Sequence, residues 1–115
     1  MYALSNRVQL IGNLGQDPEI RTLDGGKKKA SFSMATHESY RNAQGEQVKE
    51  TQWHNVVAWG KLAETVEKNL AKGKEVVVEG RLNSRSYTDK EGQKKYVTEV
   101  VVNELLLLAK KESAK

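Results

Sequence analysis

The sequence lacks cysteine, contains a single proline and has no long apolar run. Without cysteine, the chain cannot build a disulfide framework or a cysteine-ligated zinc site. The longest apolar run, residues 105–109, is far shorter than the roughly 20 residues of a membrane-spanning helix. The N-terminus shows no basic segment followed by an apolar one, so we expect no secretory signal. These absences favour a soluble domain without membrane contact and are compatible with a cytosolic location.

Residues for catalysis are also sparse. Two histidines, His37 and His54, cannot alone supply a usual catalytic zinc site. The Gly-Lys pair at 60–61 lacks the preceding glycine of a phosphate-binding P-loop. Acidic pairs such as Asp17 and Glu19 fall in predicted turns, where acidic residues commonly serve solubility. We therefore expect no enzyme, no cofactor and no metal site.

The chain is short and basic. Its 115 residues fit one domain, expected over residues 1–109 with a polar tail at 110–115. The formal net charge is +4, which suits a polyanionic partner, although many basic proteins bind none. Positive residues concentrate in the run Lys27-Lys28-Lys29 and around one predicted hairpin, at Arg81, Arg85, Lys90, Lys94 and Lys95. Phosphate contact and simple solvation remain alternative explanations of these clusters.

Hydrophobic periodicity predicts three strands, one helix and two further strands. The strands are expected over residues 4–14, 28–37, 48–59, 74–88 and 94–108, with a brief strand at 19–23 and a polar loop at 38–47. Between residues 60 and 72, Leu62, Val66 and Leu70 recur at the helical spacing of four. Gly73 stands where the C-terminal cap of this helix is expected.

This order of elements predicts an all-β domain with one short helix. A five-stranded Greek-key barrel with its helix between the third and fourth strands is the OB-fold, and Gly12 would provide a bend or bulge in the barrel wall. An open twisted sheet packed on one helix is the alternative architecture. The last two strands could each span roughly 45–50 Å, so the tip of this long hairpin should overhang the barrel.

Four aromatic residues lie where a core is not the obvious purpose. Trp53 and Trp59 are six residues apart on one strand and therefore share a face. The opposite face carries His54 and small apolar residues that could serve the core. Tyr40 opens a polar loop, and Tyr87 lies near the hairpin tip. The tryptophans could be core residues, or exposed rings on which unpaired bases stack.

Exposed rings interleaved with cations match the chemistry of single strands. A base stacked on a ring contributes about 1–3 kcal/mol whatever its identity, while lysine and arginine neutralise phosphates. A duplex hides the faces of its bases, so this chemistry selects unpaired strands.

An ordered set of short motifs over residues 3–105 resembles the bacterial single-stranded DNA-binding proteins. The motifs are Gly12-Asn13-Leu14-Gly15-Gln16-Asp17-Pro18-Glu19, Ala35-Thr36 with Glu38-Ser39, Trp53-His54, Gly60-Lys61-Leu62-Ala63-Glu64, Val76-Val77-Val78-Glu79-Gly80, Tyr87-Thr88-Asp89 and Thr98-Glu99-Val100-Val101-Val102. Each motif is weak alone, whereas their order is specific.

The resemblance implies an OB-fold homotetramer that wraps single-stranded DNA in replication, repair and recombination, in the cytoplasm at the nucleoid. It implies stacking by four aromatic residues: Tyr40, Trp53, Trp59 and Tyr87. Tyrosine stands at 40 and 87 where the family commonly has tryptophan, and Trp59 where it has phenylalanine. Expected phosphate contacts are Lys27, Lys28, Lys29, Lys61, Arg81, Arg85 and Lys94. Expected subunit contacts are Leu4, Val8, Leu10 and His54, although His54 could equally be a buried, hydrogen-bonded histidine.

The sequence departs from the family at its C-terminus. Family members typically continue into a flexible linker and an acidic tip ending in Pro-Phe, which recruits repair and replication enzymes. The sequence given ends at Glu112-Ser113-Ala114-Lys115. Natural absence of the tip and its removal both remain open, and we do not expect the residues given to recruit those enzymes through a Pro-Phe contact. An OB-fold module that mainly docks protein or RNA partners is the alternative function.

Overall fold

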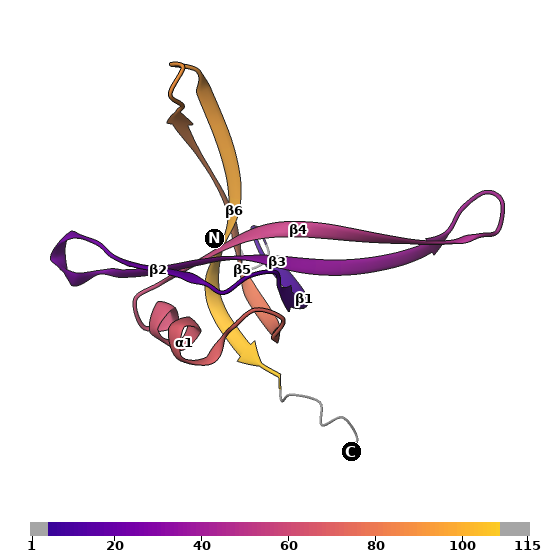
Figure 1. Ribbon diagram of the computed structural model, residues 1–115, viewed down its shortest axis with the longest axis horizontal. Coiled ribbons are helices and arrows are strands. Elements are labelled where there is room, and N and C mark those ends of the chain that lie inside the picture. The colour runs from indigo at the N-terminus through magenta and orange to yellow at the C-terminus, as the bar shows by residue number, and fades with distance from the viewer. Residues whose placement is uncertain (1–4, 109–115) are drawn as a thin grey trace.

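The alternating apolar residues form strands in the computed structural model, which describes residues 5–108 (Figure 1). The elements in chain order are β1 (Val8–Leu14), β2 (Glu19–Thr22), the 3-10 helix η1 (Asp24–Gly26), β3 (Lys28–Arg41), β4 (Gln47–Trp59), α1 (Lys61–Asn69), β5 (Glu75–Thr88) and β6 (Lys94–Leu107). Within these residues, no helix is long and apolar enough to span a membrane.

Five of the strands close into a barrel. Their order is β1-β5-β6-β4-β3, and β1 pairs with β3 to complete the circle, while β2 lies further along the same edge of β3. All the pairings are antiparallel except β4 with β6, where Val56 and Val57 pair in parallel with Val100 and Val101. The predicted OB-fold barrel is confirmed, and the open-sheet alternative is wrong.

Closure of the barrel depends on Gly12. Strand β1 pairs with β5 along residues 8–13 and joins β3 at Asn13 and Leu14. At this crossing a Cβ on Gly12 would lie 2.0 Å from the carbonyl oxygen of Ala35. Only glycine permits so close an approach of two backbones. The register shift of the barrel lies elsewhere, between Glu79 and Gly80.

The core fills the barrel, and α1 covers one end of it. Core residues come from every barrel strand and from the helix: Leu14, Ala30, Phe32, Met34, Val56, Ala58, Ala63, Val66, Leu70, Val76, Val78, Val100 and Val102.

The helix ends earlier than predicted, at Asn69, because Leu70 turns into an extended conformation that buries its side chain. The N–H of Leu70 still donates to the carbonyl of Val66. Gly73 lies in the following turn, so its predicted role as the helix cap is wrong.

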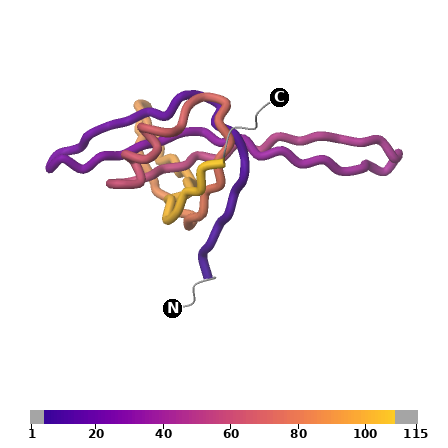
Figure 2. The backbone as a smooth tube through the Cα atoms, turned by 90° about the horizontal axis from the view of Figure 1, so that it is seen from below, coloured from indigo at the N-terminus to yellow at the C-terminus, as the bar shows by residue number. Residues whose placement is uncertain are grey.

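Two long hairpins project from the barrel (Figure 1), and Figure 2 shows the one formed by β3 and β4 extending away from the rest of the chain. The hairpin of β5 and β6 overhangs as predicted. The hairpin of β3 and β4 was not expected: half of the predicted loop at 38–47 belongs to these strands, and the connection is a tight turn at 42–46. The Asn42 side-chain oxygen accepts hydrogen bonds from the backbone N–H groups of Gln44 and Glu46, both at 2.9 Å. This side chain thus organises the turn.

Candidate nucleic-acid interface

Strand β4 separates the aromatic residues from the core. His54, Val56 and Ala58 pair with Met34, Phe32 and Ala30 on the inward face. Trp53 and Trp59 alternate with them and therefore face outward. The Trp53 side chain is 61% exposed, and Trp59 is half-buried. The interpretation of these tryptophans as core residues is therefore wrong.

Trp53 lies directly against the backbone of Gly15. A Cβ on Gly15 would lie 2.5 Å from Cζ3 of the indole, so the ring occupies space that any other residue would fill. The glycine supports one side of the ring while much of its surface stays open to solvent. The sequence marks Gly15 only as part of the motif at residues 12–19. Its contact with Trp53, 38 positions away, forms only in the folded chain and could not be predicted from a local pattern.

Trp59 carries two cations over its ring. The Nζ atoms of Lys27 and Lys29 lie 5.0 and 5.5 Å from the ring centroid. This is the range of a cation–π interaction. The stacking surface and two candidate phosphate contacts are therefore assembled at one point.

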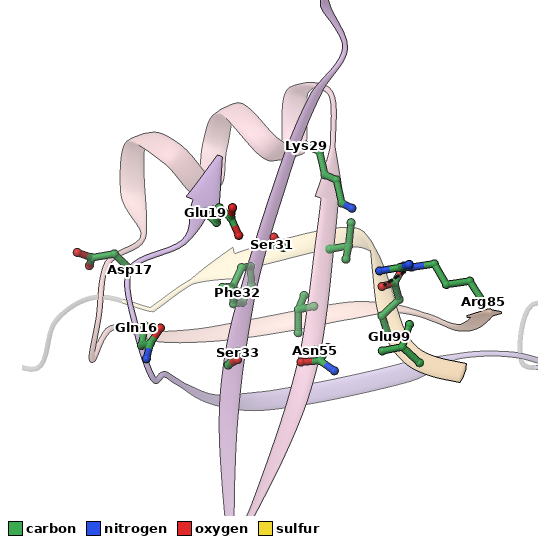
Figure 3. Close-up of a pocket in the computed structure, with 13 residues that line it drawn as sticks. Gln16, Asp17, Glu19, Lys29, Ser31, Phe32, Ser33, Asn55, Arg85 and Glu99 are labelled. Atoms are coloured by element: carbon green, nitrogen blue, oxygen red, sulfur yellow. Dashed lines mark hydrogen bonds and ion pairs between the residues drawn. The ribbon is translucent and has the colours of Figure 1, made fainter. Parts of the chain in front are cut away.

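These residues line a groove on the outer face of the barrel. One hollow of about 650 Å³ includes Trp59, Lys27, Arg81 and Asn83. A second hollow of about 280 Å³ includes Gln16, Glu19, Ser33 and Asn55 (Figure 3). Both are lined by Lys29, Arg85 and Glu99, so the two hollows adjoin, and together we call them the outer groove.

Glu99 is a buried carboxylate in this cationic groove. Its side chain is 9% exposed, and Arg85 Nε donates to its Oε1 at 3.3 Å (Figure 3). The ion pair holds Arg85 against the groove wall. Sequence reasoning gave Glu99 no role, since its contact crosses from β6 to β5.

The remaining predicted cations lie apart from the outer groove. Lys28 Nζ donates to Glu67 Oε1 of α1 at 2.6 Å, and this hydrogen bond raises the pKa of Lys28 above its usual value. Lys28 thus turns to the helix while its two neighbours turn to Trp59. Lys61 is the exposed first residue of α1. Lys94 lies near the hairpin tip, 5.7 Å from the Tyr96 ring centroid.

The two candidate tyrosines lie on the projecting hairpins, about half exposed. Tyr87 pairs with Lys95 and shares the outward face of β5 with Arg85. Tyr40 pairs with Val48, so it lies on the face of the β3–β4 hairpin opposite to Trp53. The structure therefore brings Trp53, Trp59 and Tyr87 to outward faces and leaves Tyr40 on the other face of its hairpin.

Of the predicted subunit contacts, those in the described residues pack at least partly within the barrel itself. The side chains of Val8 and Leu10 pack against the barrel core, and Leu4 lies outside the described residues. His54 also faces inward, where its Nε2 is 2.9 Å from the Thr36 hydroxyl. This contact favours the interpretation of His54 as a hydrogen-bonded, partly buried histidine.

Sequence reasoning missed an apolar row on the outside of β1, β5 and β6. Ile11 pairs with Val77, and Val77 pairs with Leu106. Ile11 and Leu106 are both more than half exposed. The three side chains therefore form a cross-strand apolar row, distinct from the outer groove.

In residues 5–108, no group of three or more histidine, cysteine, aspartate or glutamate side chains is arranged to hold a metal ion.

Comparison with known proteins gives a consistent result. A sequence profile described as the Single-strand binding protein family matches residues 5–108. A protein of Chlorobaculum tepidum named single-stranded DNA-binding protein 1 is 45% identical over 109 residues, which cover 94% of this chain and 67% of that protein. A protein of the same name from Xylella fastidiosa is 45% identical over 108 residues, which cover 93% of this chain and 79% of that protein. A solved structure described as Plasmodium falciparum SSB in complex with ssDNA superposes with a TM-score of 0.83 at 36% identity, and the match covers 94% of this chain and 99% of that one.

Proposed function

The chain belongs to the single-strand binding protein family, and on that premise we propose that its outer groove binds single-stranded DNA without selecting a base sequence. The observation that carries the proposal is the outward-facing Trp59 with Lys27 and Lys29 over its ring. The protein would act without catalysis, protecting and organising single strands during replication, repair and recombination. We place this activity in the cytoplasm at the nucleoid.

In this mechanism each tryptophan accepts the face of an unpaired base. Stacking is tolerant of sequence because every base has a π-face. Lys27, Lys29 and Arg81 supply positive charge to the phosphates along the outer groove, and Glu99 positions Arg85 beside them. Lys28 is left out of this set because it pairs with Glu67. Lys61 stays a prediction from the family resemblance.

The hairpins extend the proposed path beyond the barrel. Tyr87 continues the outward face that carries Arg85, so a strand leaving the groove along β5 meets it next. Tyr40 lies on the β3–β4 hairpin, on the face opposite to Trp53. A DNA strand that passes around this hairpin would reach it.

We propose that the protein assembles as a homotetramer with closed symmetry. Within the described residues, β1 pairs with β3 only at Asn13 and Leu14, which leaves the edge of residues 8–12 open. An open strand edge is a template for pairing with another chain. The apolar row of Ile11, Val77 and Leu106 offers a second surface to bury, and a two-fold axis would bring two copies of each together.

The experiment compares oligo-dT, oligo-rU and duplex DNA at one fixed salt concentration. We expect oligo-dT to bind well above duplex and to quench the tryptophan fluorescence, because bases would stack on Trp53 and Trp59. Equal affinity for duplex, or binding without quenching, would reject the stacking mechanism and favour an OB-fold module that docks other partners.

A further inference from the structure

The four expected stacking residues do not include the most exposed aromatic residue in the described part of the chain. Tyr96 of β6 is 71% exposed, more than Trp53. It pairs with Ser86, whereas its neighbour Lys95 pairs with Tyr87. Because side chains alternate along a strand, Tyr96 and Tyr87 lie on opposite faces of the β5–β6 hairpin, one step of the ladder apart.

The face that carries Tyr96 continues the inward face of the barrel beyond the barrel's end. Lower on these strands, Val100 and Val102 on this face are buried in the core. The hairpin overhangs, so further out the face has no core to cover it (Figure 1). Its residues beyond the core are Leu82, Ser84, Ser86, Thr88, Lys94, Tyr96 and Thr98.

The chemistry of this face suits a nucleic acid. None of its seven residues carries a carboxylate. Lys94 Nζ lies 5.7 Å from the Tyr96 ring centroid, which repeats the ring-with-lysine arrangement of Trp59. The hydroxyls of Ser84 and Thr98, 3.1 Å apart, add groups that can donate to phosphate oxygens. A basic, hydroxyl-rich face around one open ring favours a single strand over an apolar protein partner.

The position of the face connects it to the proposed path. Tyr87 lies on the outward face with Arg85, and Arg85 lines the outer groove. A single strand of DNA that has reached Tyr87 would pass over the β5–β6 hairpin to meet Tyr96 on its other face. We propose that Tyr96, with Lys94, is a further stacking site for single-stranded DNA, used by strands long enough to cross the hairpin. This inference rests on the proposed function of the outer groove.

The first test is a series of oligo-dT lengths with four variants. Trp59→Ala should weaken binding at every length, whereas Tyr96→Ala should leave short oligonucleotides unaffected. Above a threshold length, Tyr96→Ala should weaken binding by about 5- to 150-fold, the equivalent of one lost stacking contact. Tyr96→Phe keeps the ring and should retain most of the affinity. Leu82→Ala, at a half-exposed apolar residue on the same face, is the matched control and should have no length-dependent effect.

The second test maps the contact directly. Oligo-dT carrying 5-iodouracil is cross-linked to the unmodified protein by light, and the tryptic peptides are analysed by mass spectrometry. Cleavage after Lys95 gives a peptide, residues 96–110, whose only aromatic residue is Tyr96. The peptide of residues 86–90 contains Tyr87 as its only aromatic residue. We expect both peptides to be cross-linked by long oligonucleotides.

The outcomes separate this inference from the proposed function. Cross-linking at Tyr87 without Tyr96, together with normal affinity of Tyr96→Ala at all lengths, overturns the further site and leaves the outer groove intact. A Tyr96→Ala variant that changes the oligomeric state but not the affinity for long oligo-dT assigns this face to protein contacts and also overturns the inference. Failure of the parent protein to bind oligo-dT at all rejects the proposed function itself.

Discussion

Single residues in the outer groove combine two tasks that are usually separate. Trp59 offers a ring to a base and also gathers Lys27 and Lys29, which can serve the phosphates. Arg85 is held by Glu99, which adds one negative charge to a basic groove and fixes one positive charge in place. The local arrangement depends on contacts between strands, so a single substitution can alter both stacking and charge.

Removal of either tryptophan should weaken DNA binding without unfolding the domain. Trp53→Ala or Trp59→Ala should each reduce the affinity for oligo-dT by roughly 1–3 kcal/mol, because each ring would stack on a base. Both rings lie outside the core cluster, so the thermal unfolding midpoint should change little. Fluorescence titration and circular dichroism measure the two effects. A variant that fails to fold would show that the ring serves packing instead.

The three consecutive lysines, Lys27, Lys28 and Lys29, should differ in their effect on the salt dependence of DNA binding. The logarithm of affinity should fall linearly with the logarithm of salt concentration, with a slope near −0.7 for each phosphate neutralised. Replacing Lys27 and Lys29 together with alanine should therefore make the slope shallower by about 1.4. Lys28→Ala is the matched control, because Lys28 pairs with Glu67 on α1. The slope measured for this variant should equal that of the parent protein. Equal effects of the three lysines would contradict this division.

Gly15→Ala should change binding and leave the fold intact. The new Cβ would meet the far end of the Trp53 ring at 2.5 Å, and a side chain can swing away where a backbone cannot. We expect a shifted tryptophan emission spectrum and weaker binding of oligo-dT, up to the effect of Trp53→Ala. An unchanged spectrum and affinity would show that the glycine does not position the indole.

At the scale of elements, periodicity predicted the strands that bury a face and failed where none is buried. The bounds of β5 and β6 were predicted to within one residue, because their valines alternate in and out of the core. The outer halves of β3 and β4, near Tyr40 and Val48, are mostly polar on both faces of the ladder. Such a segment has no hydrophobic period, and its composition is that of a loop. Its strand pairing is visible only in the folded chain.

The end of the helix shows a similar limit. The spacing of Leu62, Val66 and Leu70 predicted a helix that includes all three. Leu70 instead reaches the core from an extended residue. Two backbone conformations can bury the same side chain, and the sequence pattern does not distinguish them.

Gly12→Ala should destabilise the barrel itself. The added Cβ would meet a carbonyl oxygen of β3 at 2.0 Å, and that oxygen belongs to backbone that cannot move without breaking the β1–β3 closure. We expect a loss of several degrees or more in the unfolding midpoint by calorimetry, as for strain in a tightly packed core. Gly15→Ala serves as the comparison, because its clash falls on a side chain. Equal midpoints for the two variants would contradict the closure argument.

At the scale of the whole molecule, the sequence predicted the shared face of the two tryptophans better than the contacts around them. The even spacing of Trp53 and Trp59 predicted their shared face, and the structure places both outside the core. The contact of Glu99 with Arg85 depends on the register of β5 against β6, which shifts at Gly80. The contact of Trp53 with Gly15 depends on barrel closure. Both relations join distant positions, and a local pattern carries no information on them.

The proposed assembly is tested by its size and by one substitution. Light scattering should report a homotetramer at micromolar concentration, because β1 has an open edge and Ile11 is half exposed beside it. Ile11→Glu would place a charge in the apolar row and should reduce the assembled mass without reducing stacking on Trp59. Lys61→Glu, an exposed change on α1, is the charge control. A monomeric parent protein at that concentration would reject the proposal.

The two lysines over Trp59 make base stacking there an exchange reaction. A base that stacks on the face where these lysines lie takes the place of an ammonium group, because Lys27 and Lys29 lie 5.0 and 5.5 Å from the ring centroid. The displaced ammonium is then released beside the phosphate that the same nucleotide brings. Loss of the cation–π contact and gain of the phosphate contact therefore occur in one step, because the same ammonium group takes part in both. In this respect Trp59 differs from Trp53, which rests on a glycine and stands open before any strand arrives.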